Sequence, residues 1–439
     1  MSTSPSKAPA ASPAASAAIP ADLADKARAL APELARWRHE LHRIPELSLE
    51  LPKTSAFVQA RLAEMGVPFR TLVGGSCVVA LLGRGARDGA DAAGPCILLR
   101  ADMDALPVAE ESGEPFASTN GRMHACGHDL HATALLGAAR LLKAHEDELV
   151  RLGGTVKLVF QPGEETFLGA RAALREGLLE EPRVDAAFAA HVIAAMPQGA
   201  IAYGTHALSG VYGFRITLEG KGGHGSSPEV CVDPITAGVH VHLALQELIA
   251  REVGARSEVA LTIGRFSSGA AANVIPDSCV LEGTMRAFDP ELMGRLVERI
   301  GEIVQGVAAT YRTRATVETL NDVPPLVLDE GMVKASRGYV AAALPEQRQV
   351  GGAHNMASAD FALVSERVPS AYFMVGAGPA DPSERYPQHN PKIRFADEAL
   401  PVQAAAYAAV ALGWLADHAP AGEKEGAGRA GASLVAREG

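Results

Sequence analysis

Short, mostly apolar segments alternate with helical patterns along this chain, and this alternation limits its possible folds more than any other feature. The apolar segments cover 96–100, 155–160, 184–190 and 371–375, and helical spacing of apolar residues covers 22–41, 54–65 and 131–145. An apolar run of this length is typical of a strand that is buried on both faces, as in a parallel sheet covered by helices. The sequence therefore predicts an α/β domain with a mainly parallel sheet flanked by helices.

The middle of the chain has a different pattern. Apolar and polar residues alternate over 211–218, 258–266, 279–287 and 312–320, and helices are predicted over 233–252 and 289–311. Strand-helix-strand-strand-helix-strand is the split βαβ, or ferredoxin-like, arrangement of a compact α+β domain. We therefore expect an inserted domain over residues 205–320, which divides a catalytic domain of residues 21–204 and 321–418.

The two ends of the chain differ from the rest in composition. Residues 1–20 are mainly Ala, Ser and Pro, and they lack the continuous apolar core of a secretory signal. Their prolines also disfavour a helix. Residues 419–439 are rich in Gly, Ala and charged side chains. We predict a disordered arm over 1–20 and a disordered tail over 419–439, neither of which carries chemistry.

The composition excludes several classes of protein. Forty basic and 51 acidic side chains give a net charge of −11, which argues against a nucleic-acid or anionic-membrane surface. The sequence has no uninterrupted apolar run near ~18 residues, so no membrane span is expected. The five cysteines are scattered and form no Cys-x-x-Cys pair, which excludes a disulfide framework and a structural zinc knuckle. A reducing, cytoplasmic location is expected.

Potential metal ligands follow the predicted strands at the points where these strands end. They are Asp102 and Asp104, then Cys126 and His128, then Glu164 and Glu165, then His191, and, after Gly376 and Gly378, His389. In open α/β sheets, ligands bind beyond the carboxyl ends of the strands. Because five separate segments bring Cys, His and carboxylate side chains to this edge, the sequence predicts a metal site there.

The chemistry of these side chains narrows the choice of metal. Sulfur, imidazole and carboxylate ligands together suit zinc, manganese or a neighbouring transition ion better than calcium or magnesium. One four-coordinate ion would not use all of them, whereas two ions that share a bridging ligand would. We therefore expect two divalent transition-metal ions per subunit, manganese or zinc first, with cobalt or nickel as alternatives.

Glu164 and Glu165 are consecutive, so their side chains diverge in regular secondary structure. One carboxylate can then bind a metal ion while the other contacts a water molecule. Metal-assisted hydrolysis requires this division, because the ion lowers the pKa of the water and the free carboxylate moves its proton to the leaving nitrogen.

Seven motifs occur in order along the chain. They are Leu99–Pro107 (LRADMDALP), Met123–Asp129 (MHACGHD), Phe160–Glu165 (FQPGEE), Gly222–His224 (GGH), Asn273–Asp277 (NVIPD), Gly283–Arg286 (GTMR) and His389–Pro391 (HNP). Together they resemble the dinuclear metal amidohydrolases, a family that includes hippurate hydrolase, N-acyl-amino-acid amidohydrolases, indole-acetyl-amino-acid hydrolases and related aminoacylase/carboxypeptidases. The resemblance extends from about residue 30 to residue 414.

The resemblance implies a role for each matching position. The metal ligands would be Cys126, His128, Glu165, His191 and His389, with the Cys126 thiolate as the bridge between the ions. Glu164 would be the general acid and base, and Asp104 would orient a ligand. His224 would enter the active site of the partner subunit and stabilise the oxyanion.

The same resemblance assigns substrate contacts and an assembly. Asn273, Arg286 and Gly376, together with His224, would form the substrate-binding set for a small-molecule carboxylate. The guanidinium of Arg286 suits bidentate binding of that carboxylate. The inserted domain would form a homodimer.

The chain departs from the usual family pattern at several positions. Gly163 replaces an alanine, Leu130 replaces a glycine, and Ala359 removes a carboxylate from an unusual segment over 351–361. Hydrolysis of an N-acyl amino acid or a small peptide-like carboxylate is the leading hypothesis. The altered segment motivates an alternative on the same metal site, a hydrolytic deaminase or ureide hydrolase that acts on an aromatic or amidine-like carbon. A catalytically silent binding protein would have lost a ligand or Glu164, and neither is lost.

Overall fold

The computed structural model describes residues 8–89 and 92–420, which form two compact units. The first unit contains the residues up to Ala207, Val327–Ala353 and the residues from Leu363 onward. The second unit contains Leu208–Leu326 and His354–Ala362. The chain therefore leaves the first unit, forms the second and returns.

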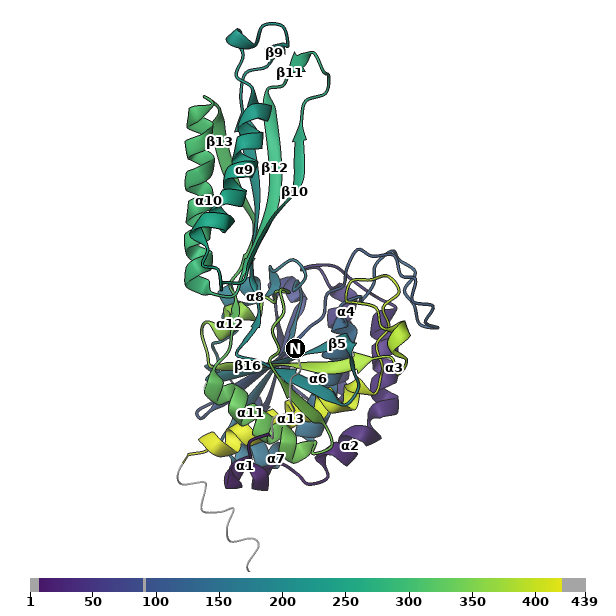
Figure 1. Ribbon diagram of the computed structural model, residues 1–439. Coiled ribbons are helices and arrows are strands. Elements are labelled where there is room, and N and C mark those ends of the chain that lie inside the picture. The colour runs from purple at the N-terminus through teal and green to yellow at the C-terminus, as the bar shows by residue number, and fades with distance from the viewer. Residues whose placement is uncertain (1–7, 90–91, 421–439) are drawn as a thin grey trace, which may run out of the picture. The chain divides into compact units, whose positions relative to one another are not determined.

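The first unit is built on an eight-stranded sheet flanked by helices (Figure 1). From edge to edge, its strands are β1 (Phe69–Leu72), β2 (Cys77–Gly83), β4 (Thr155–Gln161), β3 (Cys96–Asp102), β5 (Ala186–Pro197), β16 (Ser370–Gly378), β6 (Ala200–Tyr203) and β15 (Arg348–Gly351). All neighbours from β4 to β16 are parallel, whereas β1–β2, β2–β4 and β16–β6 are antiparallel. The predicted parallel α/β sheet is confirmed at its centre, and the antiparallel pairs lie toward the edges.

The central strands β4, β3 and β16 are buried along their whole length, as their apolar sequences predict. Their few polar residues are paired with other groups. Lys157 of β4 donates from Nζ to the carbonyl oxygens of Leu178, Glu180 and Pro182 at 3.0, 2.6 and 2.8 Å. Burial lowers the pKa of this ammonium group to about 8. These three bonds compensate for the lost hydration of the buried charge.

Helices pack against this sheet and against one another. They are α1 (Pro13–Ala18), α2 (Leu23–Ala29), α3 (Ala31–His42), α4 (Pro52–Glu64), α5 (Arg84–Asp88), α6 (His128–Lys143), α7 (Glu146–Arg151), α8 (Gly169–Arg175), α11 (Glu330–Ala343), α12 (Ala362–Ser365) and α13 (Ala399–His418). The single helix predicted over 22–41 is wrong, because α2 and α3 are separate. Pro32 explains the break, since it has no backbone N–H and its ring clashes with the preceding turn inside a continuous helix.

The predicted disordered arm over 1–20 is also wrong for part of its length. Residues 1–7 lie outside the described residues, but Pro13–Ala18 form α1. Pro13 is at the first helical position, where its missing N–H costs nothing, and the side chain of Ser12 caps the helix by accepting from the N–H of Ala15 at 3.0 Å. Ala15 is buried in a packing contact of α1 with α13. Residues 421–439 of the predicted tail lie outside the described residues.

Helix α13 is long and apolar enough to cross a membrane by length and composition alone, and it is the one such helix within residues 8–89 and 92–420. Nearly all of it is buried inside the first unit, where it packs against α6, α11 and α1. A helix with apolar residues on every side is typical of the core of a large domain.

The second unit is a four-stranded antiparallel sheet with two helices. Its strands, in spatial order, are β10 (Val259–Ser268), β12 (Ser278–Ala287), β8 (Gly210–Glu219) and β13 (Arg314–Val323), and its helices are α9 (Pro234–Glu252) and α10 (Pro290–Thr310). Its core contains Phe214, Val241, Leu281 and Ile300, which come from both helices and from the sheet. The predicted ferredoxin-like arrangement is confirmed, because the alternating strands bury one face against these helices.

The segment His354–Ala362 was predicted in the catalytic domain, but it belongs to the second unit. Arg286 of β12 donates from Nη1 to the carbonyl oxygen of Met356 at 2.7 Å and to Oγ of Ser358 at 3.0 Å. His354 stacks on Phe288 with ring centroids 3.7 Å apart. These side-chain contacts join residues that are about seventy positions apart, so local sequence patterns do not reveal them.

Candidate metal centre

The predicted ligands come from the carboxyl ends of the central strands and from the loops that follow them. His191 lies on β5, paired with Met374 of β16, and Glu164 and Glu165 lie in the turn after β4. His128 is the first residue of α6, which begins three residues earlier than predicted. Gly127 before it has φ 89°, and a Cβ atom there would lie 2.5 Å from Cγ2 of Val192. Glycine is therefore needed for His128 to begin this helix beside β5.

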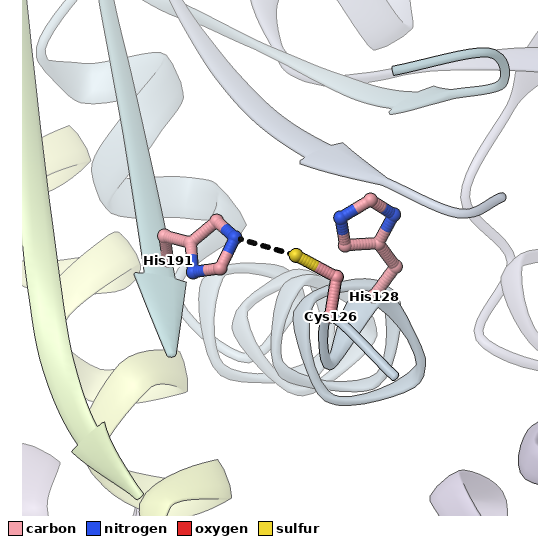
Figure 2. Close-up of side chains that lie close together, drawn as sticks. All are labelled: Cys126, His128 and His191. Atoms are coloured by element: carbon pink, nitrogen blue, oxygen red, sulfur yellow. Dashed lines mark hydrogen bonds between the residues drawn. The ribbon is translucent and has the colours of Figure 1, made fainter. Parts of the chain in front are cut away.

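Cys126, His128 and His191 point toward one another (Figure 2). The Sγ atom of Cys126 lies 3.4 Å from Nε2 of His191. The Nδ1 atom of His128 donates to the carbonyl oxygen of Asp104 at 2.8 Å, and Nδ1 of His191 donates to the carbonyl oxygen of Val192 at 2.7 Å. Because each Nδ1 atom donates to a carbonyl oxygen, Nε2 is the ring nitrogen of each histidine that faces the site and can bind a cation.

Glu165 and His389 complete the set. The Oε2 atom of Glu165 lies 3.6 Å from Nε2 of His389, and its Oε1 atom lies 3.8 Å from Nε2 of His128. The N–H of His389 donates to the carbonyl oxygen of Ala125 at 2.9 Å, which attaches its loop to the segment that contains Cys126. The backbone of His389 has a left-handed φ of 69°, a strained conformation of the kind that clusters at functional sites.

The donor set fits a metal ion. Nε2 of His128 and Oε1 of Glu165 are buried and have no nitrogen or oxygen hydrogen-bond partner among the described residues. The donor atoms of Cys126, His128 and His191 lie within 4.8 Å of one another, and so do those of Cys126, Glu165 and His389. Cys126 belongs to both groups, and these five side chains would hold transition-metal ions of the kind that bind thiolate, imidazole and carboxylate.

The shifted pKa values of Glu165, Cys126 and His191 agree with the binding of a metal ion by these side chains. Burial raises the pKa of Glu165 to about 7; His128 opposes this shift, while the charges of Asp104 and Asp102 add to it. Burial also raises the pKa of the Cys126 thiol. A cation between these groups would stabilise both anions. Burial lowers the pKa of His191, which therefore offers a neutral ring, the form that binds metals.

The two glutamates do not diverge as expected for regular secondary structure, because they lie in a turn. The donor atoms of His128, Glu164 and Glu165 lie within 4.8 Å of one another, so both carboxylates face the site. Asp104 holds the turn: its Oδ1 accepts from the N–H of Glu164 at 3.0 Å and its Oδ2 from the N–H of Glu165 at 3.1 Å. One buried carboxylate thus orients both glutamates.

The other predicted site residues have different positions. His224, Asn273 and Arg286 belong to the second unit, where β9 (Gly223–His224) pairs with β11 (Val274–Ile275). His224 and Asn273 are exposed neighbours at this strand pair, and the N–H of Gly225 donates to the carbonyl oxygen of Asn273 at 2.8 Å. Gly376 lies inside β16, where a Cβ atom would come 2.0 Å from the carbonyl oxygen of Pro197. The structure shows a packing reason for this glycine.

Sequence reasoning missed two buried polar networks around the site. In the first, His131 contacts Asp102 through Nδ1 at 2.5 Å, and Nη1 of Arg100 contacts the other Asp102 oxygen at 2.5 Å. The Asp102 carboxylate also lies 3.8 Å from Nε2 of His128. The sequence signal for this network was the spacing of His128 and His131, because residues three positions apart lie on one face of a helix.

The second network attaches α3 to the residue that follows His128. Asp129 accepts from Nε of Arg38 at 3.0 Å, and its Oδ2 atom lies 2.8 Å from Nδ1 of His42. Glu110 lies 3.1 Å from the other ring nitrogen of His42. Burial opposes a charged ring, but the charge of Asp129 and these hydrogen bonds raise the pKa of His42 to about 9. Arg38 and His42 are four residues apart, a spacing that places them on one face of a helix.

Known proteins share this chain's sequence and fold. The pattern of peptidase family M20/M25/M40 matches residues 98–413. The IAA-amino acid hydrolase ILR1-like 2 of Arabidopsis thaliana is 34% identical over 409 residues, which cover 91% of this chain and 90% of that protein. The N-acetyl-L-cysteine deacetylase of Bacillus subtilis (strain 168) is 36% identical over 349 residues, with 79% and 81% covered.

A solved structure supports the same relationship. The YXEP protein of Bacillus subtilis, a dinuclear metal-binding peptidase of the M20 family, superposes with a TM-score of 0.72 at 30% identity. The superposition covers 88% of this chain and 98% of that chain.

Proposed function

Since this chain belongs to peptidase family M20/M25/M40 and is an amidohydrolase, we propose that it cleaves the amide C–N bond of an N-acyl amino acid or a small peptide-like carboxylate. The convergence of five metal-type donors beside Glu164 is the observation that carries this proposal. The two relatives from Arabidopsis thaliana and Bacillus subtilis are named as an IAA-amino acid hydrolase and an N-acetyl-L-cysteine deacetylase, which supports an amide of an amino acid as the substrate.

The proposed ligands of two divalent ions, manganese or zinc, are Cys126, His128, Glu165, His191 and His389. When bound, such ions polarise the scissile carbonyl and lower the pKa of a water molecule. The chain supplies the remaining steps. Glu164, whose N–H is held by Asp104, takes the proton of the attacking water at its carboxylate and delivers it to the leaving nitrogen. Glu164 is buried, which limits competing exchange with bulk water.

Arg286 is the proposed site for the substrate's carboxylate. Its guanidinium is half-buried, and no carboxylate within the described residues lies close enough to form an ion pair with it. Its Nη1 atom donates to Met356 and Ser358, and these bonds fix the direction of the other N–H groups of the guanidinium. A partly desolvated guanidinium without an acidic partner is suited to bind an anion. The unusual segment 351–361 thus supports carboxylate binding and does not favour the deaminase alternative.

Arg286 cannot share one substrate with His224 and Asn273 of the same chain. Asn273, with His224 beside it, precedes the start of β12, and Arg286 lies near the end of β12. The nine residues from Ser278 to Arg286 are separated by eight steps of extended strand, which span roughly 26 Å. We therefore propose that His224 and Asn273 act in the active site of a second copy of this chain.

The second unit offers a surface for this homodimer. Ile235, Val239 and Leu243 recur every four residues on α9 and are 36%, 44% and 53% exposed, and Phe266 of the adjacent β10 is 43% exposed. Strand β10 is the edge of its sheet and pairs with β12 alone among the described strands. Two copies can pair their β10 edges and bury the apolar stripe of α9, which would otherwise stay in contact with water.

Placing a charge in this stripe is expected to separate the dimer. We expect light scattering to show dimers for the wild type and mainly monomers for Leu243→Glu. The matched control is Leu320→Glu, because Leu320 is 46% exposed on β13, the opposite edge of the same sheet. Monomers with the control and dimers with Leu243→Glu would place the interface at β13 and contradict the proposal.

A substrate panel tests the function itself. The metal-loaded enzyme is incubated with N-acyl amino acids, dipeptides and amino-aromatic acids, and released amine and ammonia are measured separately. We expect amine release from N-acyl amino acids, its loss after chelation and its recovery with manganese or zinc. Ammonia release from a substrate without an acyl group would favour the deaminase or ureide hydrolase instead.

The free state of all five cysteines agrees with the cytoplasmic location that we propose.

A further inference from the structure

The backbone of Val192, which follows the proposed ligand His191, is held from both sides. Its N–H donates to Nε2 of His131 at 2.8 Å. Its carbonyl oxygen accepts from Nδ1 of His191 at 2.7 Å and from Nε2 of Gln388 at 2.9 Å. The orientation of the His191 ring therefore depends on where Val192 is held.

The tautomer of His131 follows from these contacts. Because a backbone N–H can only donate, Nε2 of His131 must accept, and the ring proton is on Nδ1. That proton points to Asp102, 2.5 Å away, whose second oxygen contacts Arg100. All three side chains are buried, at 3% exposure or less, so solvent does not compete for these bonds. The His131 ring also packs edge-on against the His191 ring, with centroids 4.5 Å apart.

We propose that His131 is a positioning residue for His191. Held in one tautomer by Asp102, it fixes the Val192 backbone and the facing ring, so that Nε2 of His191 stays directed at Cys126, 3.4 Å away. Neither His131 nor Asp102 belongs to the proposed ligand set. The inference rests on the proposed metal site, because its effect is on the geometry of one ligand of that site.

The test measures binding of Co²⁺ to the chelator-treated full-length chain, with its visible absorption spectrum as a second readout. His131→Leu keeps a similar volume but loses both hydrogen bonds. We expect it to weaken one of the two binding steps by about 10- to 100-fold, the usual effect of removing a partner that orients a ligand. The Co²⁺ absorption bands should also shift, because the geometry at His191 changes.

Two further variants distinguish a positioning role of His131 from a role in packing alone. His131→Gln can still accept from Val192 and donate to Asp102, so we expect it to recover most of the lost affinity and the wild-type spectrum. Thr133→Val removes a buried hydroxyl on the same helix that has no hydrogen-bond partner among the described residues, and it should change neither readout. If His131→Leu does not fold, His131→Asn takes its place, since its shorter side chain cannot span both partners.

If the folded His131→Leu or His131→Asn variant binds Co²⁺ with wild-type affinity and has the wild-type spectrum, the inference is wrong. The proposed function would remain intact. An equal loss in Thr133→Val would also overturn it, because the effect would then come from packing. A wild-type chain that does not bind two Co²⁺ ions would instead contradict the proposed metal site, and the inference would fall with it.

Discussion

Glu164→Gln is expected to lower kcat by about 10²- to 10⁴-fold, the usual contribution of a general acid-base group, while the number of bound metal ions stays normal. Glutamine has the same shape as glutamate, but its amide cannot accept a proton from water at neutral pH. The backbone N–H of Glu164 would still donate to Asp104, so the turn and the neighbouring Glu165 should keep their positions. Turnover is measured with an N-acyl amino acid, and metal content by elemental analysis.

The matched comparison for Glu164→Gln is a substitution of the adjacent residue, Glu165. Glu165→Gln removes an anionic donor that faces both His128 and His389, so we expect it to lose bound metal as well as activity. If Glu164→Gln keeps more than about a tenth of wild-type kcat, the residue is not the general acid-base group. If it loses metal as Glu165→Gln does, the roles of the two glutamates are exchanged or shared.

His224→Ala is expected to lower kcat by about 10²- to 10³-fold, the cost of removing one oxyanion donor. The backbone N–H of Ser226 donates to Nδ1 of His224 at 3.1 Å, so the proton of the neutral ring is on Nε2. The ring is exposed, and this N–H is available to a substrate that a second chain binds. A separate His224→Gln variant keeps a donor and should retain part of the activity.

Mixed dimers test whether the site is shared between chains. Each of the two variants, Glu164→Gln and His224→Ala, is expected to have little activity alone. In a dimer of one chain of each, one site combines an intact Glu164 with an intact His224 from the other chain. Random exchange of equal amounts should therefore restore about a quarter of wild-type activity, since half of the dimers are mixed and each has one working site. No recovery in exchanged dimers would show that His224 acts within its own chain.

Several parts of this protein could be predicted from its sequence because they depend on local patterns. The runs 96–100 and 155–160 are apolar on both faces, which indicates parallel central strands, and these strands are β3 and β4. The ligands follow the strand ends, and parallel strands place these ends at one edge, so the predicted donors lie together. Helices α9 and α10 begin at Asp-Pro pairs whose aspartates cap them.

Other parts could not be predicted because long-range contacts decide them. The Ser12 cap and Pro13 at the first helical position are weak local signals for so short a helix, and packing of α1 against α13 stabilises it. The segment His354–Ala362 belongs to the second unit because it contacts Arg286 and Phe288 there. The role that we infer for His131 depends on Val192, sixty-one positions away.

The sequence by itself determined the main central strands, the type of each unit and the kinds of donor atom, because these follow from residue periodicity and side-chain chemistry. Only the tertiary structure decided which nitrogen of His128 and of His191 faces the site, that both glutamates point into it, and that Arg286 lies far from His224. These properties depend on hydrogen bonds and distances between residues remote in sequence, and such contacts exist only once the chain has packed.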